Sequence, residues 1–287
     1  MRRYADDQSD GKRVESLSLN GLYYAFTDDQ ARKISLLDIS SPLAPEVPLQ
    51  GNNSDVLKLS FDSHGDFLAC ADKSEIIVWS TKDHTKKTSI PLSLGYTING
   101  LERLAVSPGG RYVAATSSSG QTRLWDIHSN DHTGTTIPFD DAKSTNFSPD
   151  GTWLNIGGQE EIELWILGAN KFDPRRIPVG GDLVNFSPDG SRLAAQEPES
   201  GHISVWKLDV RDPILEGTVS QRSDFAFIDN SNLVVNEEGV FVEPFDASWA
   251  LGHVCDIVKR ELTAEERGKY LSGFDHVQAC PSRSGHM

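Results

Sequence analysis

The chain has 287 residues, 37% of them hydrophobic, and carries a formal net charge of −15. An acidic chain of this kind lacks the clustered Lys and Arg residues that nucleic-acid binding requires, and no apolar run approaches the roughly 20 residues that span a bilayer. Its first residues contain no apolar stretch typical of a secretory signal, so we expect a cytoplasmic protein that binds neither nucleic acid nor membrane.

A repeat of strand-like segments runs along most of the chain. Six segments, at residues 36–39, 78–80, 124–127, 164–166, 205–208 and 244–246, are each centred on an apolar residue. The central residues stand 39 to 46 positions apart and are Leu37, Trp79, Trp125, Trp165, Trp206 and Phe245. A turn-forming segment precedes each of them, at residues 19–21, 61–65, 106–110, 147–151, 186–190 and 227–230.

The turn segments are clearest where they read Ser-Pro-Asp-Gly, at residues 148–151 and 187–190. Proline presets φ at the second position of a type I turn, aspartate tolerates the third position, and glycine accepts the left-handed conformation that follows. The residues Pro149, Asp150, Gly151, Pro188, Asp189 and Gly190 therefore predict tight turns that join antiparallel strands.

Each unit of this length is too small to bury both faces of its own sheet, so the units must pack against one another. A period near 40 with these turns is typical of β-propeller blades of four strands. The Trp residues at the centres of the segments are expected to wedge between neighbouring sheets. An all-β sandwich with coincidental turns is the alternative.

The repeats resemble the WD40 repeats of bacterial proteins, in which Phe-Ser-Pro-Asp-Gly and Leu-Trp-Asp-Ile stand out. Here these motifs are at residues 147–151 and 186–190 and at residues 124–127, where Asp126 follows Trp125. The resemblance covers about residues 10–246 and implies a WD40-type propeller that binds protein or peptide partners through its rim. The Gly-His dipeptide that often opens such a repeat is missing, so the His–Asp network of many blades is not expected.

We expect about six blades, although seven remain open. The sixth unit has three strands, at residues 224–228, 233–236 and 240–245, and lacks an obvious outer strand. A segment near residues 2–6 could complete it and close the ring, because propellers often close in this way. The chain could equally be the C-terminal part of a longer protein. In either case we expect the propeller to occupy residues 1–246.

The tail changes from strand to helix periodicity, and we expect a helical cap at residues 247–281 followed by a disordered end or remnant at residues 282–287. One helical stripe contains Leu251, Val254, Cys255, Val258 and Leu262. Thr263 and Glu266 form a capping box that begins a second short helix, which Gly273 would end. Cys255 and Cys280 could pair, but free thiols are the default in a reducing cytoplasm.

The same tail is similar to the ending of WD40 domains in bacterial STAND-type signalling NTPases. The resemblance is carried by Trp249, Cys255, Glu266, Tyr270 and Cys280, with Arg267 where that family usually has Trp. It implies a regulatory domain of a larger signalling protein, with an NTPase module as a partner.

No sequence motif for a nucleophile, a metal site or a phosphate loop is present. We therefore expect a scaffold or sensor that is not an enzyme and needs no cofactor. The alternative is a propeller hydrolase or lactonase with a metal in the central channel, to which Asn146, Asn185 and Asp224 would contribute. The same asparagines could instead form hydrogen bonds between blades. His128 and His132 beside Asp126 are expected to form a solvated loop rather than a metal site.

Overall fold

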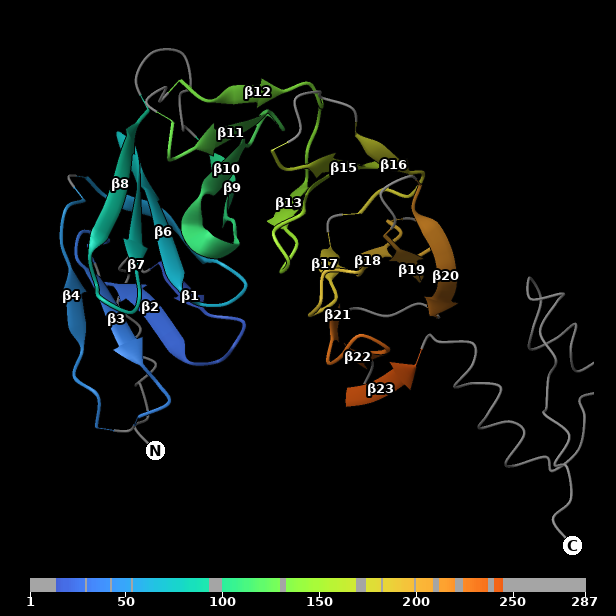
Figure 1. Cartoon of the computed structure of the whole chain (residues 1–287), viewed down its shortest axis with the longest axis horizontal. Helices are drawn as coiled ribbons and strands as arrows, with labels where there is room; N and C mark the ends of the chain where they lie inside the picture. Colours follow the sequence, from blue (N-terminus) through green and yellow to red (C-terminus); the bar gives the residue numbers. More distant parts are fainter. Residues whose placement is uncertain are drawn as a thin grey trace, which may run out of the picture.

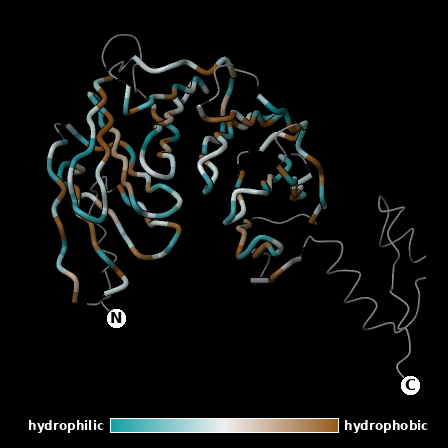
Figure 2. Tube along the Cα trace, in the orientation of Figure 1, coloured by the Kyte–Doolittle hydropathy of each residue, from teal (hydrophilic) through white to brown (hydrophobic). Residues whose placement is uncertain are grey.

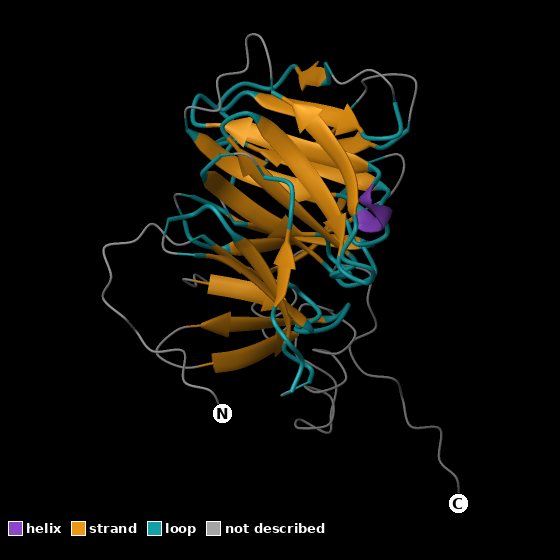
Figure 3. Cartoon of the chain, turned by 90° about the vertical axis from the view of Figure 1, so that its left-hand side faces the viewer, coloured by secondary structure: helices purple, strands orange, loops and turns teal. Residues whose placement is uncertain are grey.

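The computed structural model describes residues 14–244, with gaps at 29, 42, 53, 93–99, 130–132, 169–173, 182, 199, 209–211, 220–223 and 237–239. These residues form six separate antiparallel sheets, in each of which the strands pair in sequence order. Five sheets have four strands and the last has three (Figure 1). The only helical segment within these ranges is a 3-10 turn at Pro108–Gly110 (Figure 3), and no described helix is of a length and hydropathy suited to crossing a bilayer.

The strands follow one another along the chain as blades. The first three sheets contain β1 (Glu15–Leu17), β2 (Tyr23–Thr27), β3 (Ile34–Asp38) and β4 (Val47–Leu49); β5 (Val56–Phe61), β6 (Phe67–Asp72), β7 (Glu75–Ser80) and β8 (Lys86–Pro91); and β9 (Leu101–Val106), β10 (Tyr112–Ser117), β11 (Thr122–Asp126) and β12 (Thr135–Ile137). The last three contain β13 (Ser144–Phe147), β14 (Trp153–Gly157), β15 (Ile162–Ile166) and β16 (Arg175–Ile177); β17 (Val184–Phe186), β18 (Arg192–Gln196), β19 (Ile203–Lys207) and β20 (Ile214–Val219); and β21 (Asp224–Phe227), β22 (Asn232–Asn236) and β23 (Val240–Pro244).

The Ser-Pro-Asp-Gly segments join the first two strands of their sheets. Between β13 and β14, the Ser148 hydroxyl donates to Asp150 Oδ1 at 2.5 Å and accepts from the Trp153 amide at 2.8 Å. Gly151 has φ +74°, a left-handed conformation that side chains rarely adopt. The turn between β17 and β18 repeats these bonds. Local side-chain hydrogen bonds therefore set the direction in which the chain returns.

Five hydrophobic clusters lie between successive sheets, one at each interface. The Trp residues act as the repeat predicts: Trp79 is 1% exposed and packs at the first interface, where its indole donates to the Gln50 carbonyl at 3.1 Å. Trp125 and Trp165 are buried at the second and third interfaces, and Trp206 packs partly buried at the fourth. Strands in the middle of the sheets, such as β7 and β14, are buried along their whole length, and hydrophobic segments occur in all the sheets (Figure 2).

Six sheets with five interfaces form an arc whose first and last sheets lie at its two ends (Figure 1). The β-propeller fold predicted from the repeat is thus confirmed. The expected closing strand at residues 2–6, the helical cap at residues 247–281, the end at residues 282–287 and the central Phe245 all lie outside the described residues.

Each end of the arc presents one face that packs against no other described sheet, and we call these the end faces. In the first sheet, Leu17 pairs with Tyr24 and Tyr24 pairs with Leu37, so these three side chains point away from the second sheet. In the last sheet, Ala226 pairs with Val234 and Val234 with Val242 on the face opposite the fifth sheet. Each end face therefore carries a row of apolar side chains.

Candidate functional site

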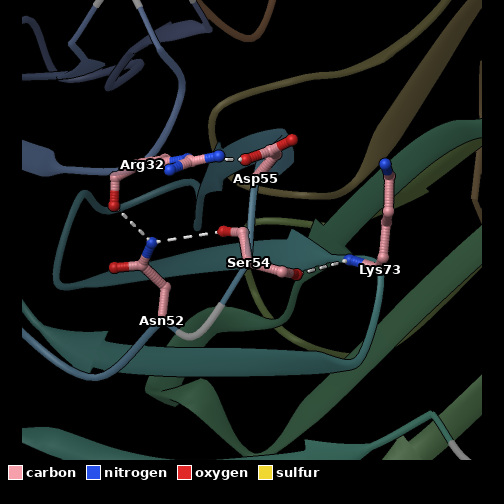
Figure 4. Close-up of a pocket in the computed structure, with 5 residues that line it drawn as sticks. All are labelled: Arg32, Asn52, Ser54, Asp55 and Lys73. Atoms are coloured by element: carbon pink, nitrogen blue, oxygen red, sulfur yellow. Dashed lines mark hydrogen bonds and ion pairs between the residues drawn. The ribbon is translucent and has the colours of Figure 1, made fainter.

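A pocket of about 500 Å³ opens on the side of the arc where the second and third strands of each blade are joined. Three connections of the first two blades line it. Arg32 comes from the β2–β3 turn, Asn52, Ser54 and Asp55 from the β4–β5 connection, and Lys73 from the β6–β7 turn (Figure 4). Connections held by a rigid sheet scaffold are where binding residues usually lie.

The turn that presents Arg32 is fixed by Asp28. The Asp28 carboxylate accepts from the backbone amides of Arg32 and Lys33 at 2.8 and 3.2 Å. The hydrogen bond from the Arg32 amide is the main reason that the pKa of Asp28 lies below its usual value. Ala31 adopts φ +54° in this turn, and its carbonyl accepts from the Val56 amide at 2.7 Å. The turn is therefore bound to the start of the second blade.

The β4–β5 connection forms the middle of the pocket. The Asn52 side-chain amide donates to the Arg32 carbonyl at 2.6 Å and, more weakly, to the Ser54 carbonyl at 3.5 Å. The Arg32 Nε donates to Asp55 Oδ1 at 3.1 Å. These bonds join the connection to the β2–β3 turn, so both backbones keep a fixed separation.

The β6–β7 turn is organised by Asp72, which is fully buried. Its Oδ1 accepts from the Ser74 amide at 2.7 Å, the Ser74 hydroxyl at 2.8 Å and the Glu75 amide at 2.9 Å, while Oδ2 accepts from the Ser54 amide at 3.2 Å. Burial favours the neutral acid, but the bonds from Ser74 and Glu75 outweigh it and hold the pKa of Asp72 below its usual value. A buried charge thus ties Lys73 to the neighbouring connection.

The pocket offers two cationic groups and an acceptor. The Arg32 side chain is 68% exposed, and its terminal nitrogens donate to no described residue. Lys73 Nζ has no ion-pair partner in the described ranges, and the bonds made by Asn52 Nδ2 leave Asn52 Oδ1 without a described donor. The arrangement suits an anionic group that lies beside a hydrogen-bond donor. In the described part of the chain, no group of three His, Cys, Asp or Glu residues is placed to hold a metal.

The residues singled out from the repeat do not line this pocket. The two Ser-Pro-Asp-Gly turns lie on the opposite side of the arc, and the four Trp residues lie between sheets. Asp126 forms a two-pronged ion pair with Arg111, at 2.9 Å for the shortest contact, and accepts from the His128 amide at 3.0 Å. Arg111 is the largest reason that the pKa of Asp126 is lowered. These residues hold the blades in shape.

Asn146 and Asn185, which we considered either as metal ligands or as links between blades, form hydrogen bonds between blades. Asn146 Nδ2 donates to the Val184 carbonyl at 3.3 Å, and Asn185 Nδ2 donates to the Phe225 carbonyl at 3.1 Å. Each bond joins the inner strand of one blade to that of the next. The side chain of Asp224 lies outside the described set, as do His132 and the tail residues Trp249, Cys255, Glu266, Tyr270 and Cys280.

The repeat pattern did not single out the pocket residues Arg32, Asn52, Ser54, Asp55 and Lys73. They lie in turns whose composition is ordinary for any exposed loop. One signal was available: Arg32 and Lys73 stand five and six residues before Leu37 and Trp79, so two neighbouring repeats place a cation in the same turn.

Comparison with known proteins supports the repeat assignment. Residues 44–80 and 95–126 match the family described as WD domain, G-beta repeat. A stretch of 147 residues is 27% identical to the lasso peptide isopeptidase AtxE2 of Asticcacaulis excentricus, and the match covers 49% of this chain. It covers only 19% of that protein, so the chain spans about a fifth of the length of this curated relative.

Two solved structures share the architecture. The β-propeller domain of Myceliophteria thermophila Cps50 (Swd1) superposes with a TM-score of 0.59 at 13% identity, covering 83% of this chain and 84% of that one. Kuenenia stuttgartiensis hydrazine synthase gives a TM-score of 0.53 at 13% identity, covering 80% and 82%. At such identities the likeness shows the fold alone. The likeness shows a β-propeller fold, and the matched residues show that this propeller contains WD40 repeats.

Proposed function

We propose that this propeller is a non-catalytic protein-interaction module whose partner docks over the pocket of the first two blades. The observation that carries the proposal is the fixed geometry of that pocket. Three connections are tied together by Asp28, Asn52 and Asp72, while Arg32 and Lys73 line the pocket on either side of Asp55 (Figure 4). A preorganised surface loses little conformational entropy when a partner binds.

The test is affinity capture of partners from the native host, with one charge reversed at a time. Arg32→Glu and Lys73→Glu change the pocket, and Lys82→Glu makes the same charge change on the opposite side of the arc, where Lys82 pairs with Asp66 at 3.0 Å. We expect the pocket variants to lose a partner that Lys82→Glu retains. Partner binding that tolerates substitutions on both sides of the arc would contradict the proposal.

We further propose that the chain is the regulatory part of a larger cytoplasmic signalling protein, in which docking of a partner releases an NTPase module. The support is the similarity of the tail to STAND-type proteins, carried by residues from Trp249 to Cys280. In a full-length protein, removal of the propeller should raise basal nucleotide hydrolysis. Unchanged hydrolysis would argue against this regulatory role.

A second candidate is a hydrolase, and the similarity to an isopeptidase over 147 residues favours it. Its test is the incubation of the purified chain with peptide and isopeptide substrates, with and without divalent cations, alongside elemental analysis for a bound metal. Turnover, or one tightly bound divalent ion per chain, would favour this candidate over the interaction module.

A further inference from the structure

We infer that the pocket of the first two blades binds a carboxylate of a protein partner, presented by an acidic peptide segment. The inference rests on the proposed interaction function and specifies its ligand. The pocket is defined by Arg32, Asn52, Ser54, Asp55 and Lys73.

Two cations of the pocket, Arg32 and Lys73, have donors to spare. Arg32 uses only its Nε in the pair with Asp55, so the planar end of its guanidinium still offers donors to a second carboxylate. Lys73 lies across the pocket from Arg32 (Figure 4) and pairs with no acid in the described ranges. Two other surface cations are already paired: Lys82 with Asp66, and Arg111 with both oxygens of Asp126. In a chain with a net charge of −15, two cations with spare donors at one opening mark a place for an anion.

A carboxylate of the pocket itself limits the charge of the anion that can bind. Asp55 lines the same pocket, and its side chain is 47% exposed. A fixed negative charge near the bound group penalises a dianion more than a monoanion. Asp28 and Asp72 add little further negative charge to the opening, because their carboxylates accept hydrogen bonds from backbone amides. The balance favours a carboxylate over a phosphate group.

The acceptor on Asn52 indicates which group of the ligand lies beside the carboxylate. Asn52 Nδ2 is held by the carbonyls of Arg32 and Ser54, which turns its Oδ1 the other way, as a ready acceptor for a backbone amide of a bound peptide. Donors for a carboxylate and an acceptor for an N–H group within one pocket are the complement of a peptide that carries an acidic residue or a C-terminal carboxylate.

The test uses two libraries of random peptides displayed on phage, one with a free C-terminus and one with the C-terminus fused to the coat protein. Peptides are selected on the whole chain and counter-selected on the Arg32→Glu/Lys73→Glu variant. Enriched sequences are then synthesised, together with versions in which Asp becomes Asn and Glu becomes Gln. Their affinities are measured by fluorescence anisotropy for the wild type, for Arg32→Glu, Arg32→Gln and Lys73→Glu, and for the matched control Lys82→Glu.

We expect acidic peptides whose affinity falls about tenfold or more in each pocket variant and in the isosteric neutral peptides, because each change removes a charge-assisted hydrogen bond. Lys82→Glu should change the affinity less than about twofold, since its site is remote. Enrichment in the fused library assigns the carboxylate to a side chain, and enrichment confined to the free library assigns it to a C-terminus. Thermal unfolding of each variant checks that it folds.

Enriched peptides without acidic residues, or peptides that bind the pocket variants normally, would overturn the carboxylate inference. The interaction module would survive that result if the peptides still located another docking surface. The absence of any enriched peptide would also overturn the inference, and the capture experiment above would then decide on the interaction module by itself.

Discussion

Interfaces in the middle of the arc and the end faces are built from similar residues but reach very different burial. Phe147 and Val106 are 7% and 3% exposed, whereas Leu17, at the same place in the register of its blade, is 59% exposed. Val205 is fully buried, whereas its counterpart Val242 is 56% exposed. Each blade supplies only half of an interface. Its apolar side chains therefore stabilise the fold only where a neighbouring blade covers them.

The largest expected effect comes from removing a wedge side chain in the middle. Trp79→Ala should lower the free energy of unfolding by about 3–5 kcal/mol, because it removes a buried indole and leaves a cavity. Leu37 stands at the same repeat position on an end face and is half-buried. Leu37→Ala should cost about 1 kcal/mol. Urea denaturation measures the loss of unfolding free energy in both variants. Equal losses would contradict the difference between the interfaces and the end faces.

A smaller but better matched contrast uses the same residue type at both positions. Val205→Ala removes two buried methyl groups between the fifth and sixth sheets and should cost about 2 kcal/mol. Val242→Ala removes the same groups from an end face and should change stability by no more than about 0.5 kcal/mol. The two midpoints should be compared in one denaturation series. A loss at Val242 as large as at Val205 would mean that this end face is covered in solution.

The sequence predicted the middle of the arc better than its ends or its pocket. The turn at residues 148–151 and the wedge at Trp165 rest on local chemistry and on period, both of which can be seen within one repeat. By contrast, Asp126 at the end of β11 forms an ion pair with Arg111, which precedes the neighbouring strand β10. The Leu-Trp-Asp-Ile motif does not indicate this partner. The role of Asn146 depended on whether it faced a metal or the next blade, and only the position of Val184 decided it.

The pocket was still harder to predict from the sequence, because its geometry depends on contacts between repeats. Asp72 resembles any turn aspartate in the sequence. In the structure it is fully buried and bonded to the Ser54 amide of the preceding connection. Spacing within a repeat cannot show such a bond, since it depends on how two blades pack.

Burial in the middle of the arc should also affect how stability depends on pH, through the carboxyl group of Glu163. Glu163 lies on the face of the fourth blade that packs against the third, where it is 2% exposed and pairs with Arg176 at 2.9 Å. Desolvation outweighs this pair and raises the pKa of Glu163. The folded state therefore holds the proton more tightly, so the stability that Glu163 provides is complete below its unfolded pKa of about 4.3 and is lost as pH rises through the folded pKa.

The variant Glu163→Gln keeps the shape and removes this titration. Between pH 4 and pH 7, the wild type should lose stability relative to Glu163→Gln. Thermal unfolding across this pH range measures the difference. A wild type that gains stability over Glu163→Gln on going to neutral pH would show that the Arg176 pair outweighs desolvation.

The smallest expected effect tests whether the first end face is open to solvent. Leu17→Glu places a charge at a position that is 59% exposed, and an exposed charge costs little. Stability should change by no more than about 0.5 kcal/mol, while binding of a hydrophobic dye should fall because the apolar face is interrupted. The matched substitution Val106→Glu, in the middle, should prevent stable folding because it buries an unpaired charge. If Leu17→Glu instead costs more than about 1 kcal/mol, some surface covers this face in solution. Light scattering at two protein concentrations would then show whether that surface belongs to a second copy of the chain, since only that case makes the loss depend on concentration.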